Sequence, residues 1–184
     1  MALPPAVQAL WDDLQAARVE VLKEVEGLTQ AQADWKPGEK DWSIGLVLDH
    51  LRLAEIASGK LTTKLTREAE AAGRLLPYPS GGRGADFFRL RAPAVPGPVE
   101  APPHIWPRGP RPIGELLAEL RSTRERSRQS IDRLGSVDPR PLKWIHILLG
   151  EVNLAHAWSI ILLHDKMHLQ QIRDLKASPG FPER

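Results

Sequence analysis

Hydrophobic residues recur every three or four positions in four stretches of the chain, with charged and polar residues between them. This spacing places the apolar side chains on one face of an α-helix, and that face must be buried against other elements. Ser43 and Asn153 stand directly before two of these stretches and suit helix N-caps. The four predicted helices cover residues 5–27, 44–72, 113–134 and 154–176. We therefore predict an all-α fold, an antiparallel four-helix bundle forming a single domain over residues 1–184.

Composition agrees with an ordinary globular domain. The chain has 184 residues, of which 42% are hydrophobic and 26% charged, with a formal net charge of only +2. A nucleic-acid partner is therefore not indicated. The one basic cluster, interrupted by Glu125, is expected on the solvent-facing side of the third helix. It consists of Arg121, Arg124, Arg126 and Arg128.

The absence of cysteine limits the chemistry. Disulfides, a cysteine nucleophile and thiolate metal ligands are all excluded, so nitrogen and oxygen must hold any metal. The first residues have no basic segment of the kind that opens a signal peptide, and no apolar run approaches a membrane span. We expect a cytoplasmic protein with no membrane partner.

Three histidines are the candidate chemical centre. His164 and His168 are four residues apart, so on a helix they share one face and lie about 6 Å apart along its axis. His50 falls on the apolar face of the second helix, between Val47 and Leu51. Three buried imidazoles would be costly without partners, and one shared metal ion satisfies them all. The pattern predicts a metal site at His50, His164 and His168 with an open position for chemistry.

The alternative is that these residues are hydrogen-bonded core histidines, because two histidines at this spacing also occur for packing alone. The HExxH motif of zinc peptidases is excluded, since Asp165 follows His164. Gln171, one turn beyond His168, either orients that imidazole or makes an interhelical hydrogen bond. The catalytic residues stay unassigned, because Asp49 and Asp165 point about 100° away from the neighbouring histidines on their helices.

The remaining histidines are expected outside this site. His104 and His146 lie in connecting segments, and His156 points away from His164 on the last helix.

Residues 74–111 form a long connection whose prolines and glycines exclude a helix. Its apolar anchors, among them Ile105 and Trp106, favour an ordered flap across the bundle and over the metal pocket.

Four segments carry a family resemblance. WSIGLVLDHL contains His50 and follows ADWKPGEKDW, LLGEVNL leads into the last helix, and HDKMHLQQI contains His164 and His168. Together they resemble the DinB/YfiT-like superfamily of bacterial proteins over most of the chain outside residues 74–111. The resemblance implies a four-helix bundle, a homodimer, and a divalent metal held by His50, His164 and His168. Some relatives have a glutamate as the third ligand, whereas this chain has histidine at both ends of the pair.

The resemblance also implies a class of function. Characterised relatives include metal-dependent transferases and isomerases that use low-molecular-weight thiols such as mycothiol or bacillithiol. We therefore expect a divalent-metal-dependent enzyme, a thiol-dependent transferase or hydrolase acting on a small molecule. Zinc or nickel is the expected metal, with iron or manganese as further candidates. The alternative is a non-catalytic, metal-stabilised binding or stress-response module.

Overall fold

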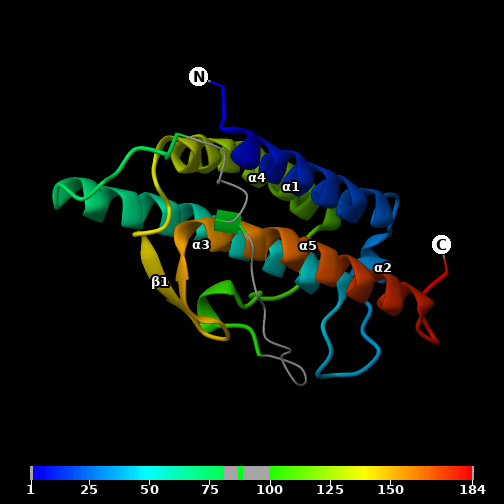
Figure 1. The fold of residues 1–184 in the computed structure, drawn as a ribbon. Coiled ribbons are helices and arrows are strands. Elements are labelled where there is room, and N and C mark those ends of the chain that lie inside the picture. Colours follow the sequence, from blue (N-terminus) through cyan, green and yellow to red (C-terminus); the bar gives the residue numbers. More distant parts are fainter. Residues whose placement is uncertain (1, 81–86, 89–99, 184) are drawn as a thin grey trace.

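A computed structural model describes residues 2–80, 87, 88 and 100–183. This part of the chain is mostly helical, and its four long helices agree with the predicted ones to within a few residues at each end (Figure 1). They are α1 (Pro5–Glu24), α3 (Ile44–Ala71), α4 (Ile113–Ser136) and α5 (Leu154–Ala177). Two short helices, α2 (Gln30–Asp34) and the 3-10 helix η2 (Pro103–Ile105), lie in the connections.

The predicted caps are present. The Ser43 hydroxyl accepts a hydrogen bond from the Leu46 amide at 3.3 Å, and the Asn153 side chain accepts one from the His156 amide at 3.2 Å. Each bond satisfies an amide that has no partner within its helix. These two caps fix where α3 and α5 begin, and therefore where their histidines lie along the helix axes.

One element was missed by the sequence pattern. The connector before α5 is an antiparallel hairpin of β1 (Lys143–His146) and β2 (Gly150–Asn153), with Lys143 opposite Asn153. An unbroken apolar run through its turn hides the alternation that marks a strand. Gly150 supplies the positive φ, +66°, at the start of β2.

The packing places α5 against both α1 and α3, and α4 against α3 and α1 (Figure 1). The buried apolar residues form two clusters. One surrounds Trp158 and Leu14, and the other surrounds Ile172, Val47 and Leu120. None of the helices that the structure describes is both long and apolar enough to cross a membrane.

Four buried charged residues lie between these two clusters along the helices. Arg18 of α1, Glu55 of α3, Arg124 of α4 and Asp165 of α5 are each at most 3% exposed. Asp165 accepts from Arg18 at 2.8 Å and from Arg124 at 3.0 Å, and Glu55 accepts from Arg124 at 2.7 Å and lies 3.0 Å from Arg18. We call these residues the charge layer. The prediction that Arg124 faces solvent is therefore wrong, because two buried carboxylates draw its guanidinium inward.

Candidate metal centre

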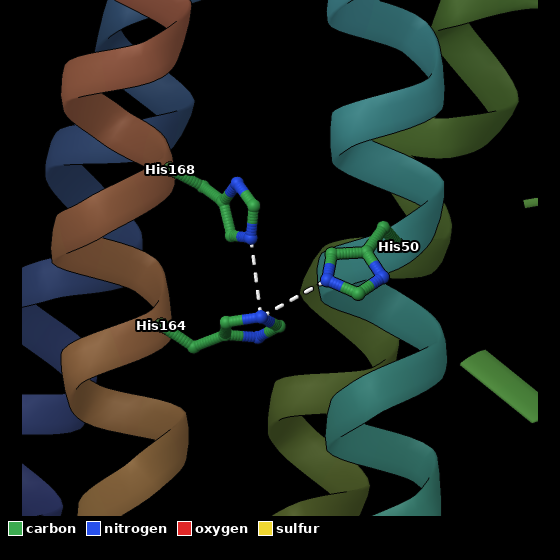
Figure 2. A group of neighbouring side chains, drawn as sticks. All are labelled: His50, His164 and His168. Atoms are coloured by element: carbon green, nitrogen blue, oxygen red, sulfur yellow. Dashed lines mark hydrogen bonds between the residues drawn. The ribbon is translucent and has the colours of Figure 1, made fainter. Parts of the chain in front are cut away.

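The structure brings His50, His164 and His168 together between α3 and α5 (Figure 2). The Nε2 atom of His164 lies 2.9 Å from Nε2 of His50 and 3.1 Å from Nε2 of His168. His164 and His168 are one turn apart on α5, as their spacing requires. His50 meets them because its face of α3 packs on α5. The three side chains form a group that could hold one metal ion.

Hydrogen bonds on the far side of two rings determine which nitrogen faces the centre. Nδ1 of His50 lies 2.9 Å from the Ile105 carbonyl oxygen, and Nδ1 of His168 lies 2.6 Å from Oε1 of Gln171. Because these oxygens accept hydrogen bonds, Nδ1 carries the proton in both rings. The Nε2 lone pairs of His50 and His168 therefore point towards His164, in the tautomer that a metal ligand needs.

The three Nε2 atoms have too few protons among them for all three to hydrogen-bond to one another. Two Nε2 lone pairs face His164, whose own Nε2 has at most one proton to offer when the ring is neutral. A cation at the centre would satisfy all three nitrogens at once. The donor set therefore fits a divalent metal better than it fits a hydrogen-bonded core.

Burial keeps the three imidazoles neutral. Desolvation, together with the neighbouring imidazoles of His168 and His50, lowers the pKa of His164 to about 2. Desolvation lowers the pKa of His168 to about 4, although its bond to Gln171 acts in the opposite sense. The pKa of His50 is also lowered, again mainly by desolvation. Neutral imidazole is the form that binds metals, so no proton has to leave at neutral pH.

Aromatic rings and the end of the long loop surround the centre. The ring of Trp42 lies 4.9 Å from that of His50, and Trp106 packs on Trp42 at 5.4 Å. The Ile105 carbonyl, which holds His50, belongs to the same loop. The described end of the predicted flap therefore reaches the site, whereas residues 81–86 and 89–99 of that flap lie outside the described residues.

The other candidate residues are not among the group that could hold the metal, although the half-buried His146 at the end of β1 lies near enough to His164 to help lower its pKa. His104 is exposed on η2, and His156 takes part in the cap of α5. Asp49 pairs with Arg52 at 2.7 Å and Asp165 belongs to the charge layer, so neither is a free base at the site. Gln171 bonds within its own helix, which supports the ligand-orienting alternative over the interhelical one.

The contact of the Ile105 carbonyl with His50 and the charge layer behind α5 were not found from the sequence. A backbone carbonyl carries no sequence signal. The charged residues each look like ordinary polar positions until their partners on other helices are known. One signal was present for the charge layer, because Asp165 directly follows a histidine on the apolar face of α5.

Comparison with known proteins agrees with the geometry. The sequence model of the DinB superfamily matches residues 13–172. The chain is 27% identical over 165 residues to the uncharacterized protein YuaE of Bacillus subtilis (strain 168), a match that covers 87% of this chain and 93% of that protein. No solved structure matches the sequence. Because the family model spans most of the chain, and the three histidines lie where the resemblance requires, this protein belongs to the DinB superfamily.

Proposed function

We propose that His50, His164 and His168 bind one divalent metal ion, zinc or nickel before iron or manganese, and that the protein is a metal-dependent enzyme. The observation that supports this proposal is the convergence of three neutral Nε2 atoms, within 4.8 Å of one another, with two of the rings held by Nδ1 bonds. Family membership supports the same interpretation. We further propose that the four long helices form the antiparallel four-helix bundle of this family.

The reaction proposed is a thiol-dependent transfer or hydrolysis on a small electrophilic molecule. A bound divalent ion would supply Lewis acidity and favour the thiolate form of a thiol co-substrate. The protein's own residues hold the rings of His50 and His168 in position and exclude water on the side of Trp42. The side chain of His164 is partly exposed whereas those of His50 and His168 are buried, so we place the approach of substrate at the exposed part of its ring.

The surface near the centre supports a homodimer. Leu163 and Met167 precede the two histidines of α5 and are 48% and 58% exposed, and Ile145 and Ile147 of the hairpin are 72% and 68% exposed. Large apolar side chains gathered on a surface mark interaction sites. We propose that a second copy of the chain covers them in the cytoplasm.

A metal-by-thiol matrix tests the enzymatic proposal. The protein, purified without a polyhistidine tag, is loaded in turn with zinc, nickel, iron and manganese. It is then assayed with mycothiol or bacillithiol and thiol-reactive, ester and amide substrates. Turnover that needs both metal and thiol, and that the His164→Ala variant lacks, supports the proposal.

A second candidate function, the non-catalytic module, is favoured by one observation: both aspartates next to the histidines are engaged in ion pairs. If chelation lowers the melting temperature but no substrate turns over with any metal, this function replaces the enzymatic one.

Gln171 gives a test of the ligand-orienting contact. The Gln171→Leu substitution removes the acceptor of the His168 Nδ1 proton, and loss of such a partner costs about 10- to 100-fold in metal affinity. Competition with a chromophoric chelator measures the zinc affinity of each variant. The matched control is Gln170→Leu, because Gln170 is exposed and its side chain bonds to Asp174 on the same helix. Equal affinity loss in both variants would show that Gln171 has no special role.

A further inference from the structure

A groove of about 470 Å³ lies between α3 and α4, and none of the three histidines lines it. Its walls include Thr123 and Ser127, the small polar residues that interrupt the apolar face of α4. Beside it the two helices approach closely, since a Cβ atom added to Gly59 would lie 3.5 Å from the Ser130 hydroxyl. The groove has the volume of a small-molecule site.

The charges at this groove are strongly one-sided. Its cationic residues are Lys60, Lys64 and Arg67 of α3 and Arg126 of α4, and its one acidic residue is Glu55. Glu55 is already ion-paired, because its carboxylate oxygens lie 2.7 Å from Arg124 and 3.0 Å from Arg18. It therefore cannot neutralise the four cations at the mouth of the groove.

Two of these cations have no partner among the described residues, namely Lys60 and Arg67. Lys64 has only a distant one, Glu68 at 4.0 Å. Arg126 donates to the Ser122 and Thr123 hydroxyls at 3.2 and 3.0 Å, and its charge helps to lower the pKa of Glu119 without a direct ion pair. The positive charge of Lys60, Lys64 and Arg67 is therefore available to a ligand.

We propose that the α3–α4 groove binds a small molecule with two anionic groups, of the diphosphate class. Lys60, Lys64 and Arg67 follow one another at i, i+4 and i+7 on α3, so their Cα atoms span about 10 Å. That length exceeds one phosphate and suits two linked ones, each met by charge-assisted hydrogen bonds. The Ser130 hydroxyl lines the same groove and can donate to the ligand, whereas the Thr63 hydroxyl already donates to the Gly59 carbonyl at 3.1 Å.

A second, smaller groove beside the first shows which of the two is the better site for the ligand. A second groove of about 240 Å³ shares Thr63, Arg67 and Ser130 with the first. Its additional cation, Arg133, is paired with Glu70 at 3.0 Å. Arg67 lines both grooves, but Lys60, Lys64 and Arg126 line only the larger one, which we assign to the ligand. This assignment does not depend on the metal centre.

Titration with sodium pyrophosphate tests the proposal. Calorimetry on the full chain is expected to show a sub-millimolar Kd, and amide resonances of Gly59, Thr63 and Ser130 should shift in NMR spectra. The double variant Lys60→Gln/Arg67→Gln should bind about 10-fold or more weakly, since it loses two charged donors. The His164→Ala variant should bind like the wild type, which separates this groove from any pyrophosphate captured by the metal centre.

A charge-matched control completes the experiment. Lys36→Gln/Arg121→Gln removes the same two charges from exposed positions that do not line the groove. Equal weakening in this control would overturn the proposal, because it would show general attraction to a positive protein. Absence of pyrophosphate binding to the wild type would do the same. A short oligonucleotide that bound the same residues more tightly than pyrophosphate would replace the small molecule by a nucleic acid.

Discussion

The His164→Ala variant is expected to lose the metal ion that we propose for the three-histidine centre. Nε2 of His164 is the atom common to both close contacts, at 2.9 Å from His50 and 3.1 Å from His168. Without it, two imidazoles on different helices remain, fewer than the three protein ligands that hold zinc in open, catalytic sites. Elemental analysis should find about one ion per chain in the wild type and almost none in the variant.

Stability provides the second measurement. A ligand that binds only the folded state stabilises it by about 2.7 kcal/mol when its free concentration is 100 times its Kd. Added zinc or nickel should therefore raise the melting temperature of the wild type and leave that of His164→Ala unchanged. The metal-free proteins should differ little, because the imidazole of His164 is neutral and crowded by two others.

The control for this prediction is His104→Ala. His104 is exposed on η2, so its removal keeps the three-histidine centre intact while changing the histidine count equally. We expect normal metal content and a normal response of the melting temperature. A His164→Ala protein that still carried one ion per chain would contradict the metal site and the function built upon it.

The sequence predicted the positions of these histidines because helical periodicity is a local property. Val47, His50 and Leu51 share an apolar face whatever the rest of the chain does, and the same holds for His164 and His168. That the two faces would meet was an inference from the cost of burying unpaired imidazoles. The structure brings the rings together, and it adds the Ile105 carbonyl, which no pattern of side chains identifies.

The hairpin and the charge layer were not predicted, for different physical reasons. The hairpin strands are four residues each, too short for alternation to stand out against the apolar run between them. Arg18 and Glu55 lie four residues after the buried Leu14 and Leu51, but charged residues are rarely buried unless paired, so their burial could be predicted only with their partners known. Their partners lie far away in the chain, with Arg18 and Asp165 separated by 147 residues. Long-range pairing of this kind is invisible to local patterns.

The Arg124→Met variant is expected to lose about 3–5 kcal/mol of unfolding free energy, the usual cost of removing one partner from a buried ion pair. Arg124 donates to Glu55, to Asp165 and to the Leu14 carbonyl, so it joins α4 to three other helices. Burial alone would raise the pKa of Glu55, yet the nearby Arg18 and Arg124 lower it, which means that the carboxylate is ionised in the folded protein. Methionine fills the space of the arginine stem but leaves two carboxylates facing one arginine.

Urea unfolding followed by circular dichroism measures this loss, and Arg121→Met is its matched control. Arg121 lies on the same helix but is exposed, so the same substitution there should change stability by less than about 0.5 kcal/mol. A loss no larger than this in Arg124→Met would contradict the role of the charge layer.

The decisive variant is the double one, Arg124→Met/Glu55→Gln. The charge layer has two arginines and two carboxylates, so it is neutral as a whole, and Arg124→Met alone leaves one uncompensated negative charge in the interior. Removing the charge of Glu55 restores neutrality, with Arg18 and Asp165 as the remaining pair at 2.8 Å. We therefore expect the double variant to be more stable than Arg124→Met, although each substitution alone is destabilising. The losses of unfolding free energy in Arg124→Met and Glu55→Gln could instead simply add in the double variant. That result would show that the charge layer stabilises the fold through separate contacts and not through its balance of buried charge.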